Sequence, residues 1–197
     1  MEPSARVRVA LYGGSFNPPH VGHVLGVVYA LSTAPIDEVL AVPVYRHPFA
    51  KNLAPYADRL EMCRRALGWI PHVTISTVEE ELGGESRTLR TLEHLREAHP
   101  EWSLRLLVGS DVLADLPKWH RWDRVAELAP PLVMGRAGVD APPVDVPWVG
   151  VRGAPSVLPH VSSSGIRAAL AAGDVEAVRG LVPASVLDLV VAKGLYR

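Results

Sequence analysis

Two histidines, His20 and His23, follow a glycine-rich turn in the segment Gly13-Gly14-Ser15-Phe16-Asn17-Pro18-Pro19-His20-Val21-Gly22-His23. Glycine lets a phosphate approach the backbone closely. Amides at a helix N-terminus attract anions. Residues three apart share one helix face, with Cβ atoms roughly 5–6 Å apart. The segment therefore combines a phosphate-binding turn with two side chains that can stabilise phosphate charge.

Four interpretations of this segment compete. A turn followed by a core helix would explain a lone Gly-Gly or Pro-Pro, but not all eleven residues together. An oxidoreductase-type dinucleotide site needs Gly-x-Gly-x-x-Gly and an acidic residue roughly 20 positions on. The glycine spacing differs, and Asp37 and Glu38 precede a strand instead of ending one. Catalytic zinc usually has three protein ligands, whereas only His20 and His23 are available here. Nucleoside triphosphate chemistry fits best.

The segment resembles the motif Gly-Thr/Ser-Phe-Asp/Asn-Pro-x-His-x-Gly-His of the HxGH nucleotidylyltransferase superfamily, which is related to class I aminoacyl-tRNA synthetases. Members transfer a nucleoside monophosphate from ATP or CTP to a phosphorylated acceptor and release pyrophosphate. The resemblance implies that His20 and His23 are catalytic. It also implies that ATP contacts Gly13, Gly14, Ser15 and Phe16.

Strand and helix patterns alternate along the chain and must position these residues. Alternating residues predict a strand at 7–12, and helical spacing of Val24, Val27, Val28 and Leu31 predicts a helix after it. Further strands are expected at 38–43, 72–76, 104–108, 132–134 and 148–151, with helices at 58–68 and 88–98. This alternation predicts an α/β fold with a Rossmann-like, doubly wound, mainly parallel sheet. Ligands bind such sheets beyond the carboxyl ends of the strands.

The C-terminal part reads differently, as three short helices at 166–172, 175–181 and 185–192. We expect a nucleotidyltransferase α/β domain over residues 1–160 and a small C-terminal helical subdomain over 161–197, packed as one compact unit. The proline-rich segment 141–147 is predicted to be a flexible loop.

Composition excludes several classes of protein. The chain has 197 residues, 48% of them hydrophobic, and a net charge of −1, so no basic excess suggests a nucleic-acid surface. No apolar run approaches the roughly 20 residues that cross a membrane. Cys63 is the one cysteine and fits the core face of the helix at 58–68. We expect a cytoplasmic protein with no nucleic-acid or membrane partner. Its oligomeric state stays open, a homo-oligomer included.

The segment Val161-Ser162-Ser163-Ser164-Gly165-Ile166-Arg167 offers a second phosphate-binding element. Its serines can cap the helix that follows, and free amides plus hydroxyls suit a phosphate. It resembles Ile-Ser-Ser-Thr-x-Ile-Arg of the bacterial nicotinate-nucleotide adenylyltransferases, one branch of the superfamily. The resemblance implies that Ser162, Ser163, Ser164 and Ile166 contact ATP. Arg167 would bind the triphosphate by fork-like hydrogen bonds and take part in catalysis.

The same branch has Gly-x-Asp-x-Leu followed by Trp-x-x-Trp, which Gly109-Ser110-Asp111-Val112-Leu113 and the pair Trp119 and Trp122 resemble. By resemblance, Gly109 and Asp111 contact the bound nucleotide, with Asp111 on a ribose hydroxyl. Trp119, expected on a loop, would stack on the nicotinate ring. The alternative is that both tryptophans belong to the core.

Acceptor recognition is expected from two further segments. After the strand at 38–43, Arg46 or Lys51 takes the place of the family's Pro-Pro-His-Lys-like element. Ser86-Arg87-Thr88 resembles Ser-Tyr-Thr of the family, with Arg87 replacing the usual tyrosine, and Ser86 or Thr88 is also expected to cap the next helix. The implied acceptor-binding residues are Asn17, Arg46, Lys51, Arg87, Thr88 and Trp119.

The predicted reaction is transfer of AMP from ATP to nicotinate mononucleotide, forming deamido-NAD and pyrophosphate by direct in-line attack. Mg²⁺ is expected to bind mainly through the ATP phosphates, with no protein metal site. Two alternatives stay open. One is a sister enzyme acting on nicotinamide mononucleotide or phosphopantetheine, and the other is a nucleotide-binding sensor without turnover.

Overall fold

A six-stranded sheet forms the centre of the protein. The computed structural model describes residues 6–48, 52–136, 157–158 and 161–197. Within these ranges all strand pairs are parallel, in the order β3-β2-β1-β4-β5-β6. The strands are β1 (Val7–Gly14), β2 (Glu38–Pro43), β3 (Val73–Ile75), β4 (Trp102–Gly109), β5 (Pro131–Arg136) and β6 (Val157–Leu158). The predicted doubly wound α/β fold is confirmed.

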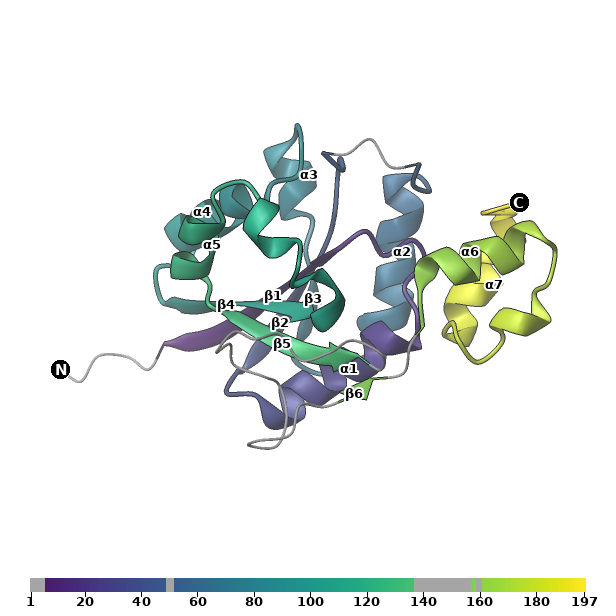
Figure 1. Cartoon of the computed structure of the whole chain (residues 1–197), viewed down its shortest axis with the longest axis horizontal. Coiled ribbons are helices and arrows are strands. Elements are labelled where there is room, and N and C mark those ends of the chain that lie inside the picture. Colours follow the sequence, from purple (N-terminus) through teal and green to yellow (C-terminus); the bar gives the residue numbers. More distant parts are fainter. Residues whose placement is uncertain (1–5, 49–51, 137–156, 159–160) are drawn as a thin grey trace.

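Helices cover both faces of this sheet (Figure 1). They are α1 (Val21–Thr33), α2 (Tyr56–Leu67), α3 (Val78–Leu82), α4 (Thr88–Ala98), α5 (Trp122–Leu128), α6 (Ser163–Ala171) and α7 (Ala184–Lys193). Figure 1 shows α3, α4 and α5 grouped on one side, whereas α6 and α7 lie together beyond α2. The sequence did not predict α3, α5 or β6. The strand expected at 148–151 and the loop expected at 141–147 lie outside the described residues.

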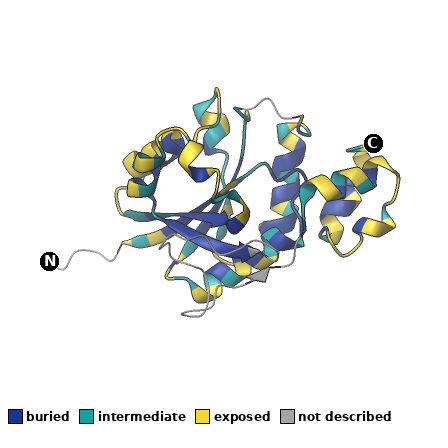
Figure 2. Cartoon of the chain, viewed as in Figure 1, coloured by how far each residue is buried: buried dark blue, intermediate teal, exposed yellow. Residues whose placement is uncertain are grey.

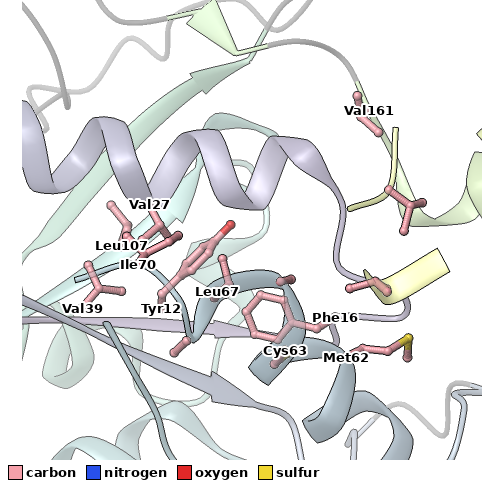
Figure 3. Packing of buried hydrophobic residues seen from close by; sticks show 14 of the residues in the cluster. Tyr12, Phe16, Val27, Val39, Met62, Cys63, Leu67, Ile70, Leu107 and Val161 are labelled. Atoms are coloured by element: carbon pink, nitrogen blue, oxygen red, sulfur yellow. The ribbon is translucent and has the colours of Figure 1, made fainter. Parts of the chain in front are cut away.

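Successive side chains of a strand point to opposite faces of the sheet, and this divides the core into two layers. Ala10 and Tyr12 of β1 belong to the cluster with α1, α2, α6 and α7. Val9 and Leu11 face the opposite cluster, built with α3, α4 and α5. The central strands β1, β2, β4 and β5 are therefore largely buried, as Figure 2 shows, which is typical of parallel sheets. Figure 3 shows Tyr12 within the first cluster.

The sheet opens at the point where its strand order reverses. Pairing between β1 and β4 stops at Leu11 and Leu106. Beyond it, β1 continues along β2 as far as Gly14, and β4 continues along β5 as far as Gly109. The carboxyl ends of β1 and β4 therefore separate. This is the crevice in which doubly wound sheets bind ligands.

The C-terminal helices share the core of the first face. Ile166, Leu170, Val186 and Val190 belong to the same buried cluster as Tyr12. The helix predicted at 175–181 is wrong, because only Glu176–Val178 forms a turn of 3₁₀ helix. Gly173 and Gly180 flank most of this segment, and both have positive φ angles, which are incompatible with an α-helix. No helix in the described ranges has both the length and the apolarity that spanning a bilayer requires.

Candidate active site

The loop between β1 and α1 is shaped by one buried ring. Phe16 has a left-handed φ of 46°, which is costly for a residue with a side chain. Its ring is only 2% exposed and meets Tyr12 edge to face at 5.6 Å, so packing offsets that cost. A Cβ on Gly14 would lie 3.3 Å from the Phe16 ring. Only glycine therefore fits at position 14 without moving Phe16.

The two histidines meet at the start of α1. His20 is the N-cap residue and is buried, whereas His23 is half-buried one turn later. The ring centroids are 3.8 Å apart. The His20 backbone N–H donates to Nδ1 of His23 at 3.1 Å. A neutral His23 therefore carries its proton on Nε2, which makes that atom a hydrogen-bond donor.

The N-terminus of α6 is bound directly to this loop. The Ser163 hydroxyl donates to the carbonyl of Pro18 at 2.8 Å, and Nη1 of Arg167 donates to the carbonyl of Asn17 at 2.9 Å. Ser162 caps α6 by accepting from the Gly165 N–H at 3.2 Å, as the sequence predicted. Two helix N-termini and one guanidinium thus converge beside the histidines, an arrangement suited to a polyphosphate.

Asn17 is almost completely buried between three elements. Its side-chain oxygen accepts from the Ala54 N–H at 3.0 Å and from the Tyr196 hydroxyl at 2.9 Å. Its Nδ2 has no hydrogen-bond partner among the described residues. A buried donor without a partner is costly, so this amide suits an acceptor atom on a ligand.

A second group of residues joins the end of β2 to the start of α4. The Ser86 hydroxyl accepts from the backbone N–H groups of Tyr45 and Arg46 at 3.0 and 3.1 Å. The Ser86 N–H in turn donates to the Arg46 carbonyl at 2.9 Å. The structure therefore brings Arg46 beside the segment 86–88, although the two are 40 residues apart in sequence. Lys51 lies outside the described residues.

The predicted cap of α4 is wrong. The N-cap residue is Arg87, and its side chain makes no capping hydrogen bond. The Ser86 hydroxyl is engaged with the 45–46 backbone instead, and Thr88 is already the first residue of the helix. Arg87 itself is exposed and pairs with Glu85 at 2.9 Å. Among the described residues, its guanidinium is held by a surface ion pair, which solvent screens.

Glu79 supports this second group from α3. Its carboxylate accepts from the Tyr45 N–H at 3.0 Å and from the Thr91 hydroxyl at 3.5 Å. Burial raises the pKa of Glu79, and its bonds from Ser86, Tyr45 and Thr91 offset only part of this effect. Loss of hydration thus outweighs hydrogen bonding in setting the charge of this carboxyl.

Arg59 of α2 links the histidine loop to the second group. Its guanidinium donates to the carbonyls of Ser15 at 3.1 Å, Val44 at 2.7 Å and Ala54 at 2.9 Å. Arg59 is 2% exposed, and burial lowers its pKa. One buried cation thus fixes three loop segments through their main chains.

The end of β4 carries the third predicted group. Asp111 is exposed in the 3₁₀ turn Ser110–Val112 that follows β4. Trp119 ends the turn Leu116–Lys118, and its ring meets Trp122 edge to face at 6.1 Å. Both tryptophans are half-buried against the second core cluster. Burial therefore does not tell which of the two tryptophans belongs to the core and which to the site.

The profile of the cytidylyltransferase-like family matches residues 11–169. That span runs from Leu11 in β1 to Ala169 near the end of α6, and it includes all three groups of site residues. The chain belongs to this family.

Among the curated members of the family, relatives named nicotinate-nucleotide adenylyltransferase resemble the chain along nearly its whole length. A "Probable nicotinate-nucleotide adenylyltransferase" of Anaeromyxobacter dehalogenans is 51% identical, covering 96% of each chain. One from Myxococcus xanthus is 41% identical over 96% of this chain and 95% of its own. The resemblance inferred from the motifs is confirmed.

Solved structures agree on the family fold. The nicotinic acid mononucleotide adenylyltransferase of Plasmodium falciparum complexed with NaAD superposes with a TM-score of 0.81. It covers 96% of this chain and 97% of its own, at 17% sequence identity. At such low identity the likeness concerns the fold.

Sequence reasoning missed Arg59, Glu79 and Tyr196 in this member of the family. The burial of Arg59 could have been predicted, because its helical spacing places it on the same face as Met62, Cys63 and Ala66. A charged residue on the apolar face of a helix needs buried partners. Glu79 and Tyr196 left no such signal, since their partners are far away in the sequence.

A cavity of about 580 Å³ lies beside the histidine loop. Residues 52–55, the α6 side chains Arg167, Ala168 and Ala171, and residues 194–197 line it. It adjoins the site through Arg167 and Tyr196, which both bond to Asn17.

Proposed function

We propose that this protein transfers AMP from ATP to nicotinate mononucleotide, releasing pyrophosphate and forming deamido-NAD. The observation that carries the proposal is the pair of hydrogen bonds that tie Ser163 and Arg167 to the carbonyls of Pro18 and Asn17. They hold the N-termini of α1 and α6 at the crevice between β1 and β4. Relatives that are 41–51% identical carry the corresponding enzyme name.

In this reaction a phosphate oxygen of the mononucleotide attacks the α-phosphorus of ATP in line. The bond from the α-phosphorus to the bridging oxygen breaks, and its electron pair leaves on pyrophosphate. The attacking phosphate is already an anion at neutral pH, so no general base is required. Catalysis then consists of positioning and charge stabilisation.

The residues of the histidine loop and of α6 supply that stabilisation. His20 and His23 act on the transferred phosphate, and Arg167 acts on the triphosphate with the amides and hydroxyls of Ser162, Ser163 and Ser164. Gly13, Gly14 and Ser15 form the surface against ATP, and Gly109 with Asp111 contacts its ribose. Phe16 and Ile166, also predicted to contact ATP, are each 2% exposed in the core, so their side chains shape the loop and α6 from inside.

The acceptor binds beside the histidine loop, toward the carboxyl end of β2. We assign it to Asn17, Arg46, Lys51, Arg87, Thr88 and Trp119. The support for this assignment is the buried, unpartnered Nδ2 of Asn17 among the described residues and the contact between Arg46 and Ser86.

The proposal includes Mg²⁺, bound mainly through the phosphates of ATP. In the described part of the chain no three His, Cys, Asp or Glu side chains gather around a possible metal site. Mg²⁺ commonly binds through substrate phosphates and waters. When bound to ATP it neutralises charge on the phosphates.

Cellular location and domain division complete the proposal. We place the reaction in the cytoplasm, where the buried thiol of Cys63 stays reduced. We assign residues 1–160 to the nucleotidyltransferase domain and 161–197 to a helical subdomain that supplies Arg167.

The test is a pyrophosphate-release assay of the purified protein with ATP, Mg²⁺ and one acceptor at a time. Nicotinate mononucleotide should give the highest kcat/KM, ahead of nicotinamide mononucleotide and phosphopantetheine. Preference for either of the other acceptors overturns the assigned substrate. Tight ATP binding without release for any acceptor overturns the enzyme assignment and favours a nucleotide sensor.

A further inference from the structure

The Asn17 side chain has a defined orientation. The atom 3.0 Å from the Ala54 N–H must be an acceptor, because a backbone N–H can only donate. That atom is therefore Oδ1, and Nδ2 points away from Ala54. The second lone pair of Oδ1 accepts from the Tyr196 hydroxyl at 2.9 Å. Both acceptor positions of this oxygen are thus used inside the protein.

Tyr196 reaches Asn17 from the last turn of the chain. After α7, Gly194 has a φ of 60° and Tyr196 a φ of 68°, so the chain reverses there. A left-handed φ is uncommon for tyrosine and indicates that tertiary contacts fix this conformation. Burial raises the pKa of the Tyr196 hydroxyl, which therefore stays protonated and able to donate.

Asn17 sits where a small displacement would matter. Its carbonyl accepts from Arg167, and His20 follows three residues later. A shift of Asn17 would therefore move Arg167 relative to His20. Misplacement of charge-stabilising groups lowers turnover more than it lowers substrate binding.

We propose that Tyr196 is a positioning residue for nucleotidyl transfer: its hydroxyl holds Oδ1 of Asn17 and thereby fixes Arg167 relative to His20. This inference rests on the proposed function and extends it to the C-terminal residues 194–197.

The first experiment compares Tyr196→Phe with Lys193→Met. Tyr196→Phe removes one hydroxyl and should lower kcat about 3–10-fold, which is the loss expected for one neutral hydrogen bond. The KM for each substrate should change less than about twofold. Lys193 pairs with Asp58 and helps dock α7 on α2 without touching Asn17. Lys193→Met should therefore lower Tm while leaving kcat unchanged.

A double-mutant cycle with Asn17 identifies the route. Tyr196→Phe should have no further effect on kcat in an Asn17→Ala background. It should keep its full effect in an Asn17→Asp background, where the accepting oxygen is retained. An unchanged kcat for Tyr196→Phe alone, or an equal loss in the Asn17→Ala background, overturns the inference.

Hydrogen exchange separates this inference from the proposed function. Tyr196→Phe should speed amide exchange in the peptide 15–23, whereas Lys193→Met should not. This readout needs no turnover. If the wild-type protein releases no pyrophosphate with any acceptor but the exchange result holds, only the function fails. Unchanged exchange in Tyr196→Phe overturns the positioning role whatever the activity.

Discussion

The two sides of the proposed site are built in different ways. The phosphate side, residues 13–23 with 162–167, is held by hydrogen bonds between elements that are about 145–150 residues apart, and His20 and Asn17 are 2% exposed. The acceptor side, residues 44–46 with 86–88, places the exposed side chains Arg46 and Arg87 over a backbone fixed by Ser86. The groups proposed to stabilise charge are thus held rigidly, whereas the two arginines proposed to bind the acceptor are exposed.

The two sides should therefore differ in how well they tolerate substitution. A buried, cross-linked phosphate side tolerates few changes, because each residue satisfies polar groups on another element. Exposed arginines can change without leaving buried groups unpaired. The replacement of the family tyrosine by Arg87 falls on this second side.

The largest effect is expected at the phosphate side. His20→Ala should lower kcat by about 10²–10³-fold, the usual cost of removing one preorganised stabilising group. The KM for ATP should change less, since the other groups on that side remain. Steady-state kinetics would check this, with the exposed His94→Ala of α4 as a control expected to behave like wild type. Near-normal turnover would remove the role assigned to His20.

Arg59→Met should disturb both sides at once. It leaves the carbonyls of Ser15, Val44 and Ala54 without their buried donor, which we expect to cost about 2–4 kcal/mol of unfolding free energy. Urea denaturation measures this, with the exposed Arg64→Met of the same helix as control. A loss below about 0.5 kcal/mol, the range of ordinary surface substitutions, would show that the two sides are held independently.

Arg87→Ala should affect only the acceptor. We expect the KM for nicotinate mononucleotide to rise about 3–10-fold, as for one exposed charge-assisted contact. The KM for ATP and Tm should not change. Arg96→Ala, exposed at the other end of α4, is the matched control. An equal rise in both KM values would contradict the division between the two sides.

The smallest effect concerns pH at the acceptor side. Burial raises the pKa of Glu79 in the folded state, so folding favours its protonated form. This contribution to stability is fully present below the unfolded pKa of a glutamate, about 4.3, and is lost as pH rises through the folded pKa. Arg59 is the charged neighbour that opposes the shift.

Glu79→Gln should therefore gain in Tm relative to wild type between pH 4 and pH 8. The expected gain is no more than about 2 °C. Thermal unfolding at the two pH values measures it, and the exposed Glu80→Gln should show no such trend. A gain that is larger at pH 4 would mean that hydrogen bonding outweighs burial at Glu79.

Local sequence patterns predicted the strands through β5, the position of α1, α2 and α4, and the cap of α6, because each depends on neighbours a few residues away. The same reasoning failed for residues 175–181, where the positive φ angles of Gly173 and Gly180 prevent the predicted α-helix. It also failed for Ser86, whose hydroxyl bonds to a distant backbone in place of its own helix.

The sequence by itself determined the fold class, the histidine pair and the family, since motif residues and hydrophobic periodicity are local properties. Tertiary structure alone decided that β1 and β4 separate beyond Leu11 and Leu106, and that Arg59 and Tyr196 hold the loops of the site. The physical reason is that a buried polar group takes whichever partner folding brings within about 3 Å. Spacing in the sequence does not indicate that partner when it lies up to 179 residues away.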